Sequence, residues 1–217
     1  MSRKHVLNVL ENKRIIAILR GDLQGRELEV LAALEEAGIA AVEMSIVSPD
    51  FDAALARIAA DFGSRIVIGA GTILSLDDLK RAITAGASFI VSPDGNREVI
   101  EATLRAGLVS LPGAYTPTEI VQVQRWGADA VKLFPASSLG PQYVRAVRAP
   151  LPDLRLVPTG GVRLDDLPAY WQAGAWAVAI GSELVNASRI KDPSLVELRT
   201  VAHAFAVAAE KSAHEAK

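Results

Sequence analysis

The sequence predicts an α/β fold, specifically a (β/α)8 TIM barrel with an N-terminal lead-in helix. Short apolar runs of strand length alternate with longer amphipathic stretches along the chain. Glycines that follow alanine or tryptophan recur before apolar runs, at steps of about 20 residues or about twice that, as in a repeating strand–helix unit. They are Gly38, Gly86, Gly107, Gly127 and Gly174. The length of 217 residues suits one domain, 1–217. An open doubly wound sheet is the alternative.

The strands are predicted from short apolar runs that end at glycine, proline or a polar residue. In chain order these runs are 15–19, 40–45, 65–69, 88–91, 108–111, 130–134, 154–158 and 176–180. Parallel strands in such a barrel carry their chemistry where each strand ends, at the C-terminal face. The residues that follow the runs are therefore the first candidates for function.

The helices are predicted from amphipathic spacing and from capping residues. Ser48-Pro49-Asp50 supplies a capping residue and a proline, Ser75 with Asp78 has capping-box spacing, and Thr116 precedes Pro117 and Glu119. In chain order, helices are expected over 1–13 and 25–37, from Ser48, from Ser75, over 95–105, from Thr116, from Asp165 and over 194–213.

Composition excludes several classes of function. The formal net charge is −2 and no run of Lys or Arg stands out, so neither nucleic acid nor a membrane surface is expected as a partner. The chain has no cysteine, which excludes disulfides, thiolate zinc sites and cysteine nucleophiles. Its histidines, His5, His203 and His214, lie near the ends, so no histidine metal site or triad is expected. No signal peptide and no long apolar run are seen, and a cytoplasmic location is expected.

A lysine interrupts the apolar run 130–134. Side chains alternate along a strand, so Lys132 shares a face with Ala130 and Phe134, while Val131 and Leu133 share the other. A buried ammonium is costly unless it is paired, neutralised or used. A salt bridge, a tip that reaches solvent, and an amine that attacks carbonyls are all compatible with these residues.

Three polar residues lie at or near the ends of the first three strands. Arg20 follows the first strand, Glu43 shares a face of the second strand with Ser45, and Thr72 ends the sequence GAGT. Each has a structural interpretation: a surface ion pair for Arg20, a bridge to Lys132 for Glu43, and loop hydrogen bonds for Thr72. Glu43 and Lys132 together also form a reactive combination, because an amine can form an imine with a ketone while a carboxyl group moves protons.

Two glycine-bearing loops follow the last two strands. Thr159-Gly160-Gly161 follows the seventh and Gly181-Ser182 the eighth. Barrels commonly bind phosphate at these loops, because glycine lets backbone N–H groups approach an anion. Together with the Lys–Glu combination, these loops indicate carbonyl chemistry on a phosphorylated substrate.

The chain resembles the family of 2-keto-3-deoxy-6-phosphogluconate (KDPG), 2-keto-3-deoxy-6-phosphogalactonate and 4-hydroxy-2-oxoglutarate (KHG) aldolases. The resemblance covers about residues 6–187 and rests on a series of motifs in order. They are ILRG (18–21), VEMSIVSPD (42–50), IGAGTIL (68–74), FIVSPD (89–94), LPGAYTPTE (111–119), AVKLFPASSLGPQYVRAV (130–147), VPTGGV (157–162) and AIGSELV (179–185). It implies a class I aldolase that cleaves KDPG to pyruvate and glyceraldehyde 3-phosphate, with no metal and no organic cofactor.

The resemblance also implies roles for individual residues. Lys132 matches the Schiff-base lysine and Glu43 the acid/base. Thr72 matches a residue that binds the pyruvyl carboxylate, and Pro93 and Phe134 match apolar walls around the pyruvyl carbons. The phosphate cradle corresponds to Gly160, Gly161, Gly181 and Ser182. Family members are usually trimers, so a homotrimer is expected.

Two departures from the family pattern matter. Some members carry an arginine four residues after the glutamate, where this chain has Val47, and we expect Arg20 to supply the missing charge. Thr159 resembles the gluconate type, in which a hydroxyl bonds the C4 oxygen, whereas FPASSLGPQY resembles the galactonate type. A phosphosugar epimerase and a non-catalytic phosphate-binding barrel are the competing interpretations, although no interior histidine is available for the metal of such an epimerase.

Overall fold

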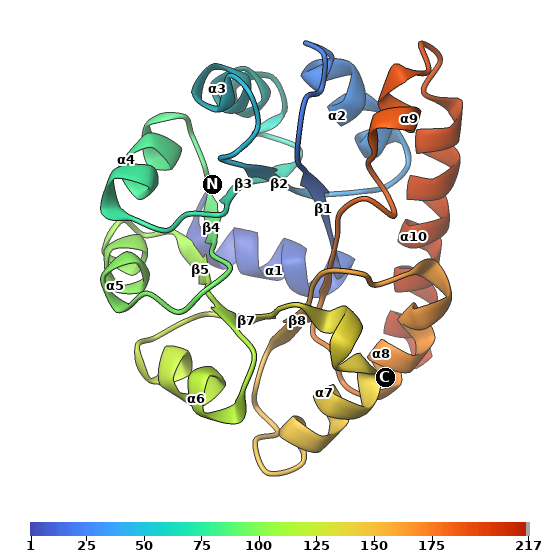
Figure 1. Cartoon of the computed structure of the whole chain (residues 1–217). Coiled ribbons are helices and arrows are strands. Elements are labelled where there is room, and N and C mark those ends of the chain that lie inside the picture. The colour runs from blue at the N-terminus through green and yellow to red at the C-terminus, as the bar shows by residue number, and fades with distance from the viewer. Residues whose placement is uncertain (216–217) are drawn as a thin grey trace.

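Helices and strands alternate along the chain in the computed structural model, which describes residues 1–215 (Figure 1). The strands are β1 Ile15–Leu19, β2 Ala41–Ser45, β3 Val67–Gly71, β4 Phe89–Val91, β5 Val109–Leu111, β6 Gly113–Ala114, β7 Val131–Leu133, β8 Leu156–Pro158 and β9 Val178–Ile180. The α-helices are α1 Arg3–Lys13, α2 Glu27–Glu36, α3 Phe51–Phe62, α4 Leu76–Thr84, α5 Arg97–Arg105, α6 Pro117–Arg125, α7 Gly140–Arg148, α8 Leu167–Gln172, α9 Ala187–Lys191 and α10 Val196–Glu215. Two 3-10 helices, η1 Ala136–Ser138 and η2 Leu164–Asp166, complete the described elements.

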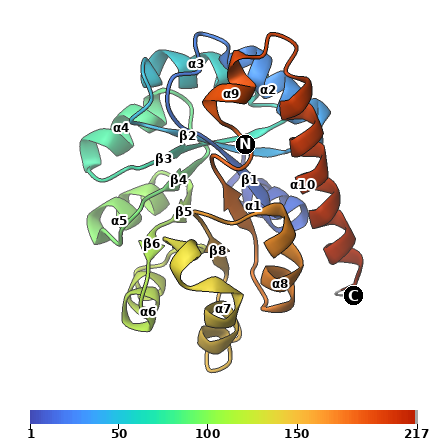
Figure 2. The ribbon, with the colours of Figure 1, turned by 45° about the vertical axis from the view of Figure 1, so that its right-hand side comes forward.

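Except for α1, the helices lie around the outside of the strands, and α10 runs along the outer surface beside α2 and α8 (Figures 1 and 2). Every strand pair is parallel. This arrangement confirms the predicted α/β architecture, in which parallel strands are covered by the helices that connect them. Among the described residues, no helix is both long enough and apolar enough to cross a membrane.

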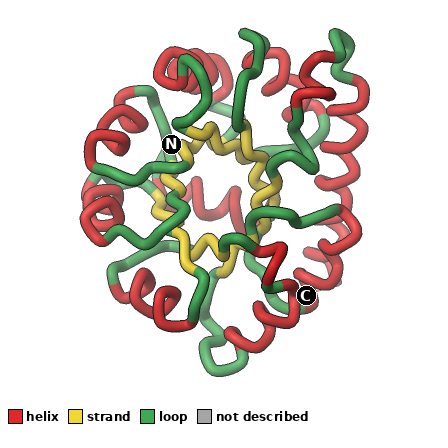
Figure 3. The backbone as a smooth tube through the Cα atoms, viewed as in Figure 1, coloured by secondary structure: helices red, strands yellow, loops and turns green. Residues whose placement is uncertain are grey.

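The strands form two sheets. One has the order β5-β4-β3-β2-β1-β9 and the other the order β6-β7-β8. The sheets meet at both edges: Thr159 forms a parallel bridge with Ala179, and the backbone N–H groups of Asp129 and Ala130 donate to Ser110 O. In the tube view the strands form a ring, and α1 is seen through it (Figure 3).

Apolar side chains form two core clusters. The outer cluster fills the space between strands and helices and includes Val131 and Leu133. The inner cluster includes Ala41 and Ala130 from the opposite face of the strands, together with Val6 and Leu10 of α1. We call the strand face that carries this second cluster the inner face. Because α1 is amphipathic in this way, its buried side closes one end of the inner face.

The glycines that we predicted to end helices all do so. Each of them directly follows the C-cap residue of a helix and has positive φ; they are Gly38, Gly86, Gly107, Gly127 and Gly174. Two predicted caps are also present: Ser75 accepts from Asp78 N at 3.1 Å, and Thr116 forms a capping box with Glu119.

Several predicted boundaries are wrong. The third strand runs over Val67–Gly71, so the glycines of GAGT belong to the strand itself. The fifth strand is divided into β5 and β6 on either side of Pro112, a residue that lacks a backbone donor for the sheet. Asp165 lies in η2, one turn before α8 begins.

The prediction that Ser48 caps α3 is also wrong. The residue at the N-cap is Asp50, in the left-handed region with φ 50°, and it makes no side-chain capping bond. The Ser48 hydroxyl instead accepts a hydrogen bond from Gly21 N in the loop after β1. α9 was not predicted at all, because its five residues are too short to produce an amphipathic pattern.

Candidate active site

Lys132 lies in the middle of β7 with only 6% of its surface exposed. Its backbone pairs with Gly113 on one side and Val157 on the other, and its N–H donates to Pro112 O at 2.9 Å. Ala130, two residues earlier, belongs to the inner cluster. Alternation along the strand therefore puts the Lys132 side chain on the inner face, as predicted.

Glu43 lies on the inner face of β2, two residues after Ala41 of the inner cluster, and is 1% exposed. Burial raises the pKa of its carboxyl group above the ordinary value of 4.5, while the positive charges of Lys132 and Arg20 act in the opposite direction. Its Oε2 atom has no hydrogen-bond partner among the described residues. An unsatisfied carboxyl oxygen this deeply buried is costly and is typical of a group that meets a substrate or a bound water.

Glu43 and Lys132 interact electrostatically but do not form a direct ion pair. The charge of Lys132 lowers the pKa of Glu43, yet among the described residues no nitrogen–oxygen contact within 4.0 Å joins them. The interpretation of the two residues as a closed structural salt bridge is therefore wrong. A buried amine and a buried carboxyl group that are near each other but not consumed by mutual pairing can both serve a third molecule.

Arg20 and Thr72 lie at the same ends of the strands. Arg20 follows β1 and is exposed, and its charge reaches the Glu43 carboxyl group. Thr72 follows β3, and its hydroxyl is 2.9 Å from that of Ser45 on β2. Thr72 has φ 63°, a backbone conformation that β-branched residues rarely adopt and that is often found at functional sites.

Phe134 and Pro93 border a cavity of about 350 Å³ that is also lined by Gly113, Ala114 and Tyr115. The Lys132 Nζ atom lies 5.2 Å from the centroid of the Phe134 ring, within the range of a cation–π contact. Phe134 is 36% exposed. Phe134 therefore contacts the buried amine and also borders this cavity, which extends to Val123 of α6 and to Trp126 at its C-cap and is not lined by Lys132 or Glu43.

The two glycine-bearing loops are adjacent, because the bridge between Thr159 and Ala179 joins the strands that precede them. Gly160 and Gly161 have positive φ, which other residues avoid. A Cβ atom at Gly181 would meet no described atom within 4 Å, and Ser182 is exposed. Thr159 is buried at 2% exposure and its hydroxyl donates to Val157 O at 3.0 Å. The loops therefore offer accessible backbone next to a buried hydroxyl.

Sequence reasoning assigned no role to Ser45 and Gly71. Ser45 is 1% exposed and its hydroxyl contacts Thr72. A Cβ atom at Gly71 would overlap the Glu43 carboxyl group. The position of Ser45 two residues after Glu43 was the available signal, since both side chains lie on the inner face. Gly71 gave no separate signal, because the close approach involves two different strands.

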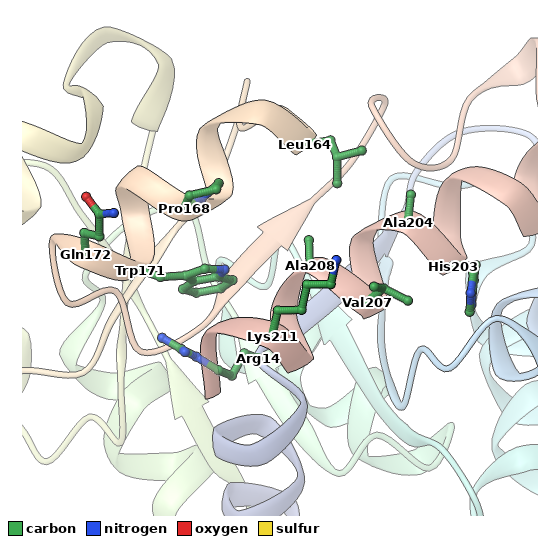
Figure 4. Close-up of a pocket in the computed structure, with 10 residues that line it drawn as sticks. All are labelled: Arg14, Leu164, Pro168, Trp171, Gln172, His203, Ala204, Val207, Ala208 and Lys211. Carbon is green, nitrogen blue, oxygen red and sulfur yellow. The ribbon is translucent and has the colours of Figure 1, made fainter. Parts of the chain in front are cut away.

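A larger cavity, of about 800 Å³, contains none of the predicted site residues (Figure 4). It lies on the outer side, between α8 and α10, and Arg14 stacks on Trp171 there at 4.0 Å from the ring centroid. The Arg14 guanidinium donates to Ala175 O and Trp176 O. Among the described residues, no group of three or more His, Cys, Asp or Glu could hold a metal ion.

The sequence matches the KDPG and KHG aldolase family over residues 6–201. It is 35% identical over 176 residues to the 2-dehydro-3-deoxy-6-phosphogalactonate aldolase of Escherichia coli strain K12, covering 81% of this chain and 86% of the relative. It is 32% identical over 189 residues to the 2-dehydro-3-deoxy-phosphogluconate aldolase of Treponema pallidum strain Nichols, covering 85% and 88%.

A solved structure shows the same fold. It is the KDPG aldolase of Legionella pneumophila with pyruvate captured at low pH as a covalent carbinolamine intermediate. It superimposes with a TM-score of 0.84 and 25% sequence identity, over 92% of this chain and 97% of that chain.

Proposed function

This chain belongs to the KDPG and KHG aldolase family and is an aldolase, a carbon–carbon lyase, and on that premise we propose that it cleaves KDPG to pyruvate and glyceraldehyde 3-phosphate through a Schiff base on Lys132. The observation that carries the proposal is the arrangement of Lys132 and Glu43. A buried amine lies near a buried carboxyl group that keeps one oxygen unbonded. The carbinolamine captured in the Legionella pneumophila relative supports covalent chemistry of this kind.

The proposed reaction begins with attack of the Lys132 amine on the C2 ketone of the substrate. Loss of water from the carbinolamine gives an iminium ion, which draws the electron pair of the C3–C4 bond as the C4 hydroxyl loses its proton. Glyceraldehyde 3-phosphate leaves, and the remaining enamine is protonated at C3. Hydrolysis of the new imine releases pyruvate and the free amine. The iminium ion serves as the electron sink, so these steps use no metal and no organic cofactor.

Glu43 is the proposed proton carrier. Burial raises the pKa of its carboxyl group, which favours the protonated form that a general acid needs. It would protonate the leaving hydroxyl of the carbinolamine, accept the C4 hydroxyl proton and return it to the enamine carbon, through a water molecule where the distance requires one. The unpartnered Oε2 atom is the site from which these transfers would take place.

The remaining site residues are proposed to hold the substrate. Arg20 and the Thr72 hydroxyl bind the pyruvyl carboxylate, since a guanidinium pairs strongly with a carboxylate. Pro93 and Phe134 contact the pyruvyl carbons, and Thr159 the C4 oxygen. The backbone of Gly160, Gly161, Gly181 and Ser182 binds the phosphate.

We also propose that the two sheets act as one closed (β/α)8 TIM barrel in a single domain, 1–217. If β5 and β6 are counted as one strand divided at Pro112, the barrel has eight strands, and the contacts at both sheet edges support its closure.

The family likeness supports a homotrimer. The substrate carries a phosphate and a carboxylate that do not cross a bilayer unaided, which supports a cytoplasmic location.

The galactonate epimer is the second candidate, because the relative from Escherichia coli strain K12 is a phosphogalactonate aldolase. The test is to incubate the purified chain with each C4 epimer, and with unphosphorylated 4-hydroxy-2-oxoglutarate, and to follow pyruvate release. We expect the highest kcat/KM for the gluconate epimer. Faster cleavage of the galactonate epimer would reassign the substrate, and no pyruvate from any of the three would contradict the proposed function.

A further inference from the structure

The Arg20 guanidinium donates no hydrogen bond to any of the residues that the structure describes. Arg20 follows directly after β1 and is exposed, although its charge reaches the buried Glu43 carboxyl group. An arginine side chain has several rotatable bonds and loses much freedom when it is fixed. Its direction therefore depends on how the backbone leaves the strand at Arg20 and Gly21.

One side-chain hydrogen bond fixes that backbone. Gly21 N donates to Ser48 Oγ at 3.1 Å, which joins the loop after β1 to the loop after β2. Ser48 is 6% exposed, and its own N–H donates to Ser45 O at 3.0 Å, so it is anchored to the end of β2. Gly21 has φ 100°, and a Cβ atom there would meet no described atom within 4 Å. No side-chain packing surrounds the Cα of Gly21, so the bond to Ser48 is the contact that links this residue to the loop after β2.

The loop after β2 provides no cation of its own next to this bond. Residue 47 is a valine that is 57% exposed, and the next residue is Ser48. The Ser48 hydroxyl in the loop after β2 thus contacts the loop after β1, and that loop carries the cation Arg20. Leu23, which is 4% exposed, anchors the far side of the same neighbouring loop in the outer core cluster.

We propose that Ser48 is a positioning residue, which directs Arg20 toward the carboxylate of the substrate by accepting the hydrogen bond from Gly21 N. The inference rests on the proposed carboxylate-binding role of Arg20. It predicts that the contribution of Ser48 to substrate binding passes through the Arg20 guanidinium. Removal of Ser48 should then have no effect on carboxylate binding once Arg20 is absent.

A double-mutant cycle tests the inference, because such a cycle measures whether two side chains act together. The variants are Ser48→Ala, Arg20→Ala and the double variant, with the pyruvate concentration for half-maximal borohydride trapping as the readout. We expect this concentration to rise roughly 10- to 100-fold in Arg20→Ala and about 3- to 10-fold in Ser48→Ala, the range for lost charged and neutral hydrogen bonds. The extent of trapping at saturating pyruvate should be unchanged in both, and the double variant should match Arg20→Ala.

Ser92→Ala is the matched control. Ser92 is a buried loop serine whose hydroxyl donates to Ile73 O at 2.6 Å, a bond that does not involve the Arg20 loop. If Ser92→Ala changes the half-saturating pyruvate concentration, its fold-change should be the same with and without Arg20→Ala. If Ser48→Ala does not fold, Ser48→Cys replaces it, since a thiol is of similar size and accepts hydrogen bonds only weakly.

The outcomes separate the inference from the proposed function. Independent, multiplicative effects of Ser48→Ala and Arg20→Ala would overturn the positioning role. An unchanged half-saturating concentration in Arg20→Ala would overturn it as well, because Arg20 would then not bind the carboxylate. Failure of the unmodified chain to form any adduct would instead contradict the proposed Schiff-base function.

Discussion

The Glu43 carboxyl group lies directly against the backbone of Gly71, so closely that a Cβ atom at position 71 would overlap its Oε1 atom. The two residues are on neighbouring strands, β2 and β3, and are offset by two positions, since Glu43 pairs with Gly69. The absence of a side chain at Gly71 therefore makes room for the proposed proton carrier. The backbone of Gly71 limits the space around Oε1, and the buried Oε2 atom has no hydrogen-bond partner among the described residues.

The first prediction concerns this contact. Gly71 does not have positive φ, so Gly71→Ala adds no backbone strain and places a methyl group against Glu43. We expect a loss of about 1–3 kcal/mol in the free energy of unfolding, the usual cost of overpacking, together with reduced turnover. Denaturant unfolding and a cleavage assay measure both. The stability loss should be smaller when Glu43→Ala is also present, and equal losses in the two backgrounds would contradict the proposed contact.

The second prediction concerns pH and Glu43. Because burial raises the folded-state pKa above 4.5, the folded protein retains a proton that the unfolded chain releases. The contribution of the protonated carboxyl group to the free energy of unfolding is fully present below pH 4.5, and it is lost as the pH rises through the folded-state pKa. The difference in unfolding free energy between Glu43→Gln and the unmodified chain should therefore move in favour of Gln as the pH rises from about 4, and then level off.

Denaturant unfolding of both proteins across this pH range measures the difference. A difference that moves in favour of Glu as the pH rises would show that the carboxyl group is not held in its protonated form. The same substitution removes the proposed proton carrier, so turnover should fall on the order of 10²-fold or more. Lys132 trapping should remain possible because the amine is still present, but it should be slower, because Glu43 is also the proposed acid for loss of water from the carbinolamine.

The third prediction concerns Thr72, whose hydroxyl contacts Ser45. Thr72→Val keeps the shape of the side chain and removes the hydroxyl, while Thr72→Ser keeps the hydroxyl. If the hydroxyl binds the substrate carboxylate, Thr72→Val should raise KM about 10-fold, the effect of a lost hydrogen bond to a charged group. Thr72→Ser should stay close to the unmodified enzyme. A Thr72→Ser variant as impaired as Thr72→Val would indicate that the methyl group, and not the hydroxyl, is required.

The fourth prediction concerns the phosphate loops. Gly181 does not have positive φ, and a Cβ atom there would meet no described atom within 4 Å, so Gly181→Ala should fold normally. An added methyl group would obstruct the approach of a phosphate to the backbone, and KM for the phosphorylated substrate should rise on the order of 10-fold. Trapping of unphosphorylated pyruvate should be unaffected. An equal loss with both ligands would show that Gly181 is not specific to the phosphate.

The features that sequence reasoning predicted correctly are those with a short-range signal. Helix-ending glycines, apolar runs and the Thr116–Glu119 capping box are each set by residues a few positions apart. The inner orientation of Lys132 follows from alternation along one strand. These signals are strong because backbone conformation and side-chain period are local properties.

The features that it missed depend on contacts between segments far apart in the chain. Ser48 looked like a helix cap but bonds Gly21 instead. The positive φ of Thr72 could not be predicted, since a β-branched residue disfavours it and only the surrounding structure imposes it. The contact between Glu43 and Gly71 likewise requires the register of two strands.

Borohydride reduction in the presence of pyruvate, followed by peptide mass mapping, tests the central proposal most directly. The Schiff-base mechanism predicts one reduced pyruvyl group per chain, on the peptide that contains Lys132, and none in Lys132→Ala. An adduct on a different lysine, or no adduct in the unmodified chain, would contradict the proposal that the buried Lys132 amine is the nucleophile.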